Sequence, residues 1–292
     1  MCQLAQKKET GPRISIGMPV YNGERFMHKA IDSLLAQTMS DFELIISDNA
    51  STDSTEAICR NYEKQDARIR YARQTTNQGP GVNFRFVLEE AVGNYFMWAA
   101  ADDYWSVNWL EILLRDFIPG TALSFGHVVS VDERDNVIEQ FKYRGLSSIP
   151  FVCWVQYYLR EEMYYKANYI YGLYERKGLL KFAFRQTYGA DNHFVFEVIQ
   201  QGRLSTNPNA LFFKRSVATS EAASAKEASS GFIRKLLLLD LLPYYLIFPK
   251  LARSYWLKFV ILILLPLKYF KSLCFMTYRS VSARLRRKGL LA

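Results

Sequence analysis

Residues 42–53 read Phe42-Glu-Leu-Ile-Ile-Ser-Asp-Asn-Ala-Ser-Thr-Asp53, an apolar run that ends in a polar turn. The run predicts a buried strand, and the amphipathic segment 54–65 that follows predicts a helix. The same order of strand, turn and helix recurs on both sides of this stretch. The expected strands are 14–20, 42–47, 69–73 and 95–99, and the expected helices are 24–37, 54–65, 82–91 and 107–117. This alternation predicts an α/β fold with a mostly parallel sheet flanked by helices.

Turn-forming or acidic residues follow each predicted strand, at the edge where such sheets bind ligands. Asp48 comes directly after its strand and can accept hydrogen bonds from a base or a ribose. Asp102 and Asp103 follow the strand 95–99. Two adjacent carboxylates suit Mg²⁺ or Mn²⁺, because these ions take oxygen ligands. The alternative for this pair is to cap the helix that follows.

The regular alternation ends near Phe117. Beyond it we expect a hairpin of 123–131 and 137–143, helices at 151–159, 175–184 and 192–201, and a strand at 210–214. The organisation expected from these patterns is a tail at 1–12, a domain at 13–215, a Ser/Ala-rich linker at 216–231 and a basic, apolar region at 232–292.

Charge divides the chain into two parts. The 292 residues carry a net charge of +9, yet residues 1–212 hold 22 basic and 25 acidic side chains, whereas 213–292 hold 15 basic and 3 acidic ones. Because half of all residues are hydrophobic, at 50%, a disordered or fibrous protein is excluded. The positive charge therefore belongs to the C-terminal part alone.

Two apolar runs lie in this basic part, at 235–248 and 255–270. A spanning helix needs about 20 apolar residues, and charges or prolines interrupt both runs before that length. We therefore expect amphipathic helices that lie on an anionic membrane surface. Two buried core helices, a short spanning hairpin and a nucleic-acid-binding arm are the alternatives. Residues 1–12 lack the apolar stretch of a signal peptide, so we expect peripheral attachment at the cytoplasmic face, with no nucleic-acid partner.

The sequence has no G-x-G-x-x-G, no G-x-x-x-x-G-K-[ST] and no G-x-S-x-G. The motifs that it does contain are Met18-Pro-Val-Tyr-Asn-Gly23, Ser33-Leu-Leu-Ala-Gln-Thr38, residues 42–53, Asn77-Gln-Gly79, Asn83 and Ala101-Asp-Asp-Tyr-Trp105. In this order and spacing they resemble the family 2 glycosyltransferases, closely over 13–117 and more loosely over 118–212.

The resemblance implies a Rossmann-like A-type glycosyltransferase fold, a sugar donor linked to UDP, GDP or dTDP, a divalent metal and inversion at the anomeric carbon. Residues 13–117 would form the nucleotide-sugar half and 118–215 the acceptor half. The implied donor-binding residues are Pro19, Tyr21, Glu24, Asp48, Asn77 and Asp102, and the implied ligands of Mg²⁺ or Mn²⁺ are Asp102 and Asp103. The family's Asp-x-Asp-Asp run is incomplete, because Ala100 stands at the position of its first aspartate.

The acceptor half supplies the implied catalytic base. Ala190-Asp191 resembles a Glu-Asp pair of the family whose aspartate is the base, so Asp191 would take the proton of the acceptor hydroxyl. Its alternative is to cap the helix 192–201. We expect a metal-dependent inverting glycosyltransferase that acts on a lipid-linked or cell-surface glycan. A non-catalytic sugar-nucleotide-binding or scaffold protein of a glycan assembly is the alternative, which Ala100 and Ala190 favour.

Overall fold

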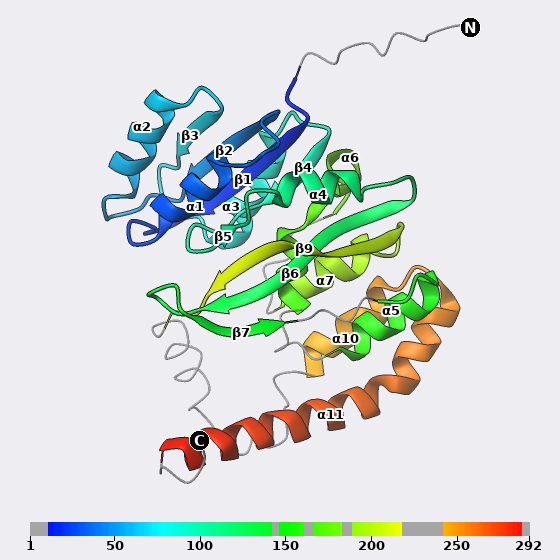
Figure 1. Cartoon of the computed structure of the whole chain (residues 1–292). Coiled ribbons are helices and arrows are strands. Elements are labelled where there is room, and N and C mark those ends of the chain that lie inside the picture. Colours follow the sequence, from blue (N-terminus) through cyan, green and yellow to red (C-terminus); the bar gives the residue numbers. More distant parts are fainter. Residues whose placement is uncertain (1–10, 142–145, 161–165, 183–188, 218–241, 288–292) are drawn as a thin grey trace, which may run out of the picture.

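The computed structural model describes residues 11–141, 146–160, 166–182, 189–217 and 242–287 (Figure 1). Strands and helices alternate in its N-terminal half. The strands are β1 (Ile14–Val20), β2 (Phe42–Asp48), β3 (Ile69–Arg73) and β4 (Tyr95–Trp98), and the helices are α1 (Met27–Leu35), α2 (Thr55–Gln65), α3 (Pro80–Glu89) and α4 (Trp109–Arg115). Each expected element is confirmed, with ends that differ by a few residues.

The second half is less regular. Its strands are β5 (Tyr104–Trp105), β6 (Thr121–Val131), β7 (Val137–Phe141), β8 (Leu173–Glu175) and β9 (Arg203–Arg215). Its helices are α5 (Pro150–Leu159), the 3-10 helix η1 (Lys166–Tyr171), α6 (Arg176–Leu179), α7 (Ala190–Val198), α10 (Leu242–Leu251) and α11 (Tyr255–Arg287). The predicted hairpin is confirmed. The helix expected at 175–184 was too long, since α6 ends at Leu179, and residues 183–188 lie outside the described ranges.

The strands of these ranges form one nine-stranded sheet in the order β3-β2-β1-β4-β8-β6-β9-β5, with β7 beside β6 (Figure 1). The pairs β2/β3, β1/β2 and β1/β4 are parallel. The long pair β6/β9 is also parallel, whereas β4/β8, β6/β8, β6/β7 and β5/β9 are antiparallel. The sheet is therefore mixed, and the expectation of a mostly parallel sheet holds only from β3 to β4. For β6 and β7 the physical reason is their connection, because a short turn such as 132–136 joins antiparallel strands, whereas a parallel pair needs a crossover.

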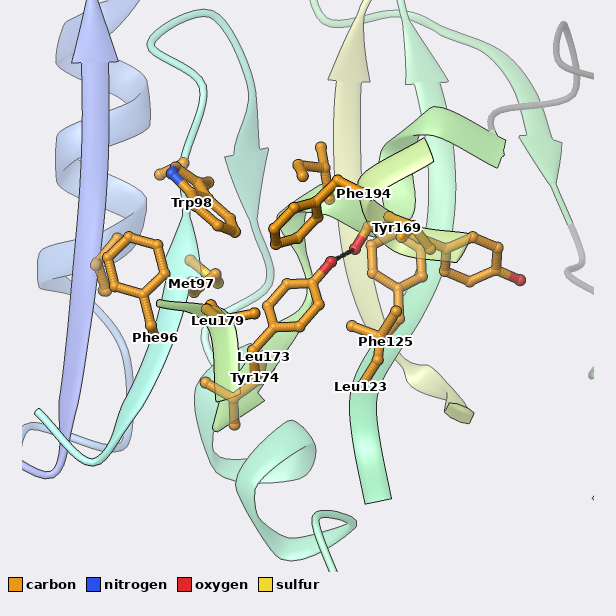
Figure 2. Packing of buried hydrophobic residues seen from close by; sticks show 14 of the residues in the cluster. Phe96, Met97, Trp98, Leu123, Phe125, Tyr169, Leu173, Tyr174, Leu179 and Phe194 are labelled. Carbon is orange, nitrogen blue, oxygen red and sulfur yellow. Dashed lines mark hydrogen bonds between the residues drawn. The ribbon is translucent and has the colours of Figure 1, made fainter. Parts of the chain in front are cut away.

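One hydrophobic core joins the two halves of the sheet. Trp98 at the end of β4 packs edge-on against Tyr174 of β8, at 5.9 Å between ring centroids, and against Phe194 of α7, at 5.3 Å. Figure 2 shows these rings converging between the strands. The hydroxyl of Tyr174 donates to the backbone oxygen of Tyr169 at 2.6 Å, so this buried hydroxyl is satisfied. The core therefore fixes α7 relative to the carboxyl end of β4.

The C-terminal helices belong to the same core. Helix α10 packs against α7 and α11, and α11 packs against α5. Phe248 and Tyr245 of α10, and Leu257 and Ile261 of α11, are buried in the common hydrophobic cluster. No helix within the described ranges is long and apolar enough to cross a membrane. Most of the expected linker 216–231 lies outside those ranges.

Candidate active site

The loops that follow β1 and β2 are tied together by hydrogen bonds. The backbone N–H of Ser54 donates to the carboxylate of Glu24 at 2.9 Å, and the N–H of Glu24 donates to Asp53 at 3.1 Å. Asp53 also accepts from the N–H of Thr55 in the first turn of α2. Glu24 thus supports the start of α2, while the neighbouring Tyr21 exposes 49% of its surface. Pro19, near the end of β1, is half-buried.

Asp48 ends β2 and its side chain is fully buried, at 0% exposure. Its Oδ1 accepts the N–H of Ser51 at 2.8 Å. Its Oδ2 accepts the hydroxyl of Tyr71 at 2.8 Å and Nη1 of Arg73 at 2.7 Å. Sequence reasoning missed Tyr71 and Arg73, although Arg73 ends the predicted strand 69–73 and so stands at the same sheet edge as Asp48. Asp48, Tyr71 and Arg73 therefore form one hydrogen-bonded polar cluster. A third of the Arg73 side chain is exposed.

Asn77 holds the loop after β3 against the loop after β2. Its Oδ1 accepts from the side chain of Asn49 and from the N–H of Gly79, both at 2.9 Å. Asn49 in turn accepts the N–H of Gln78 at 2.9 Å. The structure thus brings Asn77 beside the residue that follows Asp48. The carboxyl ends of β1, β2 and β3 therefore form one connected polar edge.

Asp102 and Asp103 lie between β4 and β5, and β5 pairs with β9 so that Tyr104 faces Phe213. This pairing places the end of β9 beside the two carboxylates. Asp103 Oδ1 accepts the N–H of Arg215 at 2.8 Å, and its Oδ2 lies 3.5 Å from Nζ of Lys214. Burial raises the pKa of Asp103 to about 6, against the opposing charge of Lys214. Helix α4 begins later, after Asn108, and no side chain caps it, so the capping alternative for this pair is not supported.

Arg215 holds the acidic loop, which carries Asp102 and Asp103 between β4 and β5. Only 2% of its side chain is exposed. Its Nε donates to the backbone oxygen of Asp102 and its Nη1 to that of Asp132, both at 3.0 Å. Its Nη2 pairs with Asp135 at 2.7 Å. The guanidinium therefore joins the acidic loop to the turn between β6 and β7. Sequence reasoning missed it, because a two-residue strand such as β5 leaves no periodicity that would predict its pairing with β9.

The donor set at this loop fits a hard divalent cation. Among the residues that the structure describes, no group of three or more His, Cys, Asp or Glu side chains is placed to hold a metal. Mg²⁺ needs fewer, because it is commonly held by one or two carboxylates together with substrate phosphates and water. Asp103 Oδ2 is buried without a hydrogen-bond partner, and Asp102 is half-buried beside it. The pair can therefore serve an ion whose other ligands come from a phosphorylated substrate.

Asp191 lies in the first turn of α7, whose N-cap is Gly189. Its Oδ1 accepts the N–H of Asn192 at 2.8 Å. Burial raises the pKa of Asp191, and the positive charges of Lys166 and Lys214 oppose this rise. Neighbouring His193 is fully buried, and its Nε2 lies 3.1 Å from the backbone oxygen of Tyr244.

Tyr171 and Lys214 interact by charge with the acidic pair and with Asp191. Burial raises the pKa of Tyr171, and the charges of Asp103, Asp102 and Asp191 all add to this rise. Lys214 Nζ lies 5.9 Å from the centre of the Tyr171 ring. Three carboxylates from distant parts of the sequence therefore act by charge on the same tyrosine. Such a set of groups can bind a cation and a phosphate and can also accept a proton.

Comparisons with known proteins agree with this geometry. The sequence profile described as "Glycosyl transferase family 2" matches residues 15–174. The chain is 32% identical over 136 residues to "GalNAc(5)-diNAcBac-PP-undecaprenol beta-1,3-glucosyltransferase" of Campylobacter jejuni, covering 46% of this chain and 44% of that protein. It is 39% identical over 129 residues to an uncharacterized glycosyltransferase of Haemophilus influenzae, covering 44% of this chain and 52% of that one. The chain thus spans about half the length of these relatives.

Two solved structures share the fold. TarS 1-349 of S. aureus, in complex with UDP, superposes with a TM-score of 0.57 at 18% identity, covering 70% of this chain and 60% of that one. The mannosyltransferase PcManGT of Pyrobaculum calidifontis, in complex with GDP-Man and Mn²⁺, superposes with a TM-score of 0.55 at 17% identity, covering 94% and 87%. The expected A-type glycosyltransferase fold is confirmed. Since the family profile matches more than half of its residues, the chain belongs to glycosyl transferase family 2.

Proposed function

We propose that this protein transfers a sugar from a nucleotide-diphospho-sugar to a hydroxyl group, with inversion at the anomeric carbon. The observation that carries the proposal is that Asp103 lies 3.5 Å from Lys214, which lies 5.9 Å from the Tyr171 ring, and that Asp102, Asp103 and Asp191 all act by charge on this tyrosine. The pair Asp102 and Asp103 can hold a cation that binds a diphosphate, and the separate carboxylate of Asp191 can accept a proton. Direct displacement needs both, because the leaving group gains charge while the attacking hydroxyl loses a proton.

The nucleoside is assigned to the polar edge at the ends of β1, β2 and β3. Pro19 and Tyr21 would line its pocket, and Asp48 would accept a hydrogen bond from the base through the remaining lone pair of Oδ1. Glu24 and Asn77 would hold the surrounding loops through the contacts described above. A UDP-, GDP- or dTDP-linked sugar would then extend its diphosphate toward Asp102. Solved relatives in complex with UDP and with GDP-Man support this class of donor.

Asp102 and Asp103 would hold Mg²⁺ or Mn²⁺. Bound there, the ion would offset the negative charge that develops on the leaving diphosphate. Asp191 would take the proton of the acceptor hydroxyl as the oxygen attacks the anomeric carbon. The bond from that carbon to the diphosphate oxygen breaks, and its electron pair leaves with the phosphate. The raised pKa of Asp191 makes it a stronger base than an ordinary aspartate.

We assign the acceptor to a lipid-linked or cell-surface glycan at the cytoplasmic face of a membrane. Helix α11 presents a stripe of exposed apolar side chains at spacings of three and four residues. They are Trp256, Phe259, Ile263, Leu267 and Phe270, with exposures of 74, 56, 60, 56 and 63%. Lys258 and Lys271 are exposed on the same helix. Such a face suits the boundary between anionic headgroups and acyl chains. The name of the Campylobacter relative specifies an undecaprenol-linked acceptor.

A binding screen tests the donor site. We expect one of UDP-, GDP- or dTDP-sugars, in Mn²⁺, to raise the melting temperature, because a ligand of the folded state stabilises it. Asp191→Asn should keep that shift and lose transfer, whereas Asp66→Asn, whose carboxylate pairs with Arg68, should keep both. Transfer at the wild-type rate by Asp191→Asn would show that the base is another group. Donor binding by the wild type without transfer or hydrolysis would favour the scaffold alternative.

Vesicle sedimentation tests the membrane surface. The double variant Trp256→Ser with Phe259→Ser should lose binding to phosphatidylglycerol vesicles. The matched control, Val92→Ser with Val107→Ser, removes two exposed apolar side chains, at 56 and 55% exposure, that lie outside α11. It should bind like the wild type. Equal binding by both double variants would contradict the assignment of α11.

A further inference from the structure

Lys214 places a positive charge at the centre of the site, where neither the motifs nor the metal assign it a role. It is the penultimate residue of β9 and reaches the site because β9 pairs with β5 beside the acidic loop. Its Nζ lies 3.5 Å from Asp103 Oδ2, which is longer than a well-formed N–H···O bond of about 2.7–3.2 Å. The lysine side chain is 30% exposed, whereas that of Asp103 is 0% exposed. The Lys214 side chain is therefore partly open to solvent, whereas the carboxylate that it pairs with is enclosed.

The Lys214–Asp103 ion pair is not needed to hold the acidic loop in place. Arg215 already fixes the acidic loop, through its N–H to Asp103 and its Nε to the backbone of Asp102. Asp103 Oδ2 is buried and its ion pair with Lys214 is long, at 3.5 Å, so the contact leaves room for the ammonium to take another partner. The flexible four-carbon stem of lysine can carry the ammonium several ångströms from its resting place.

The charges at the site show why a second cation is useful. The charges of Asp102 and Asp103 act on Lys214, and the charge of Lys214 acts on Asp191, so three carboxylates share this one lysine before any donor arrives. A donor adds the two negative charges of its diphosphate, and repulsion between like charges at this range is large where solvent is limited. A divalent ion held by Asp102 and Asp103 offsets part of this charge. Lys214, whose charge acts on both Asp103 and Asp191, can offset the remainder.

We propose that Lys214 is a diphosphate-binding residue of the donor site, whose Nζ leaves Asp103 Oδ2 and donates to a phosphate oxygen. The inference rests on the proposed function. In this role the lysine neutralises charge on the leaving group beside the metal, and it frees Asp103 Oδ2 for the ion. Nucleoside diphosphates should consequently bind even without a divalent cation, and that metal-free binding should depend on Lys214.

Calorimetric titration with UDP, GDP and dTDP, each in EDTA and in Mn²⁺, tests this. For the diphosphate that binds the wild type, Lys214→Met should weaken binding roughly 10- to 100-fold in EDTA, as expected for loss of a charged hydrogen bond, and less in Mn²⁺. Lys214→Arg should retain most of the affinity. Lys250→Met, which removes one exposed positive charge from α10, should bind like the wild type. The matching nucleosides, which carry no phosphate, should bind wild type and Lys214→Met equally.

The outcomes separate the two proposals. If none of the three diphosphates binds the wild type in Mn²⁺, the proposed function itself fails. Suppose that one diphosphate binds the wild type in Mn²⁺. If the wild type and Lys214→Met then have the same affinity for it in EDTA, or if neither binds it there, the role of Lys214 is refuted. Manganese affinity, followed by electron paramagnetic resonance without nucleotide, gives a second readout. Lys214→Met should bind Mn²⁺ at least as tightly as the wild type, because a competing cation has been removed, and weaker binding would contradict the inference.

Discussion

Gly189→Ala tests whether the C-terminal helices support α7, the helix that carries Asp191. Gly189 is the N-cap of α7 and has φ +69 and ψ 25, in the left-handed region. A non-glycine residue there costs about 1–2 kcal/mol. A Cβ at this position would lie 2.3 Å from Cε2 and 2.8 Å from Cδ2 of Tyr244, so the ring must move. That ring is 3% exposed and packs 4.7 Å from the ring of His193, and forcing such a shift costs about 1–3 kcal/mol.

The expected loss of unfolding free energy is therefore about 2–5 kcal/mol, measured by urea denaturation. In a Tyr244→Ala background the clash disappears and the backbone cost of about 1–2 kcal/mol remains, so a double-mutant cycle should give a coupling of about 1–3 kcal/mol. Gly178→Ala is the matched control. A Cβ there meets nothing within 4 Å, and alanine should stabilise α6 by up to about 1 kcal/mol. Equal costs of Gly189→Ala in both backgrounds would refute the reasoning.

Three further outcomes are expected. The raised pKa of Asp191 places the acid limb of kcat/KM above the ordinary aspartate value of about 3.9, so activity falls as pH drops through that limb, and Lys166→Met should move the limb higher still. A pH profile with its limb at or below 3.9 would contradict the assignment. Arg215→Met should lower the free energy of unfolding by about 2–4 kcal/mol, measured by denaturation, and should weaken Mn²⁺ binding, measured by metal titration. Arg215→Lys should restore part of both losses. Asp48→Asn should weaken binding of the nucleoside by roughly 10-fold or more in calorimetry, and unchanged affinity would remove Asp48 from the base pocket.

The N-terminal half of the fold was predictable because each strand there is long enough to show its apolar run and is separated from the next by an amphipathic helix. The second half was not, for local reasons. β5 and β8 have two and three residues, too few for a period to appear. β9 contains Asn207, Pro208 and Asn209, which read as a turn, so the sequence predicts a strand only from residue 210. The structure accommodates this interruption by a shift in register between Phe125 and His127 of the neighbouring β6.

The candidate site shows the same division. Asp48, Asp102 and Asp103 were predictable because each follows an apolar strand directly. Lys214 and Arg215 were not, because they arrive through a strand pairing that spans more than a hundred residues. Asp191 came from a resemblance rather than from periodicity, and its local contact, a bond to the next backbone N–H, carries no signal of function by itself.

The packing of α10 on α7 has a practical consequence for handling the protein. An apolar, basic C-terminal region is a natural candidate for deletion when soluble protein is prepared. Deleting everything after Val217 would uncover Phe196, which packs 5.1 Å from Phe248, and would take away the backbone oxygen of Leu251 that accepts from Gln200. The shortened protein would lose the α10 side of the packing around α7, which carries the proposed base, whatever its relation to lipid. Polar substitutions along the exposed face of α11 would improve solubility and leave the packing of α10 on α7 in place.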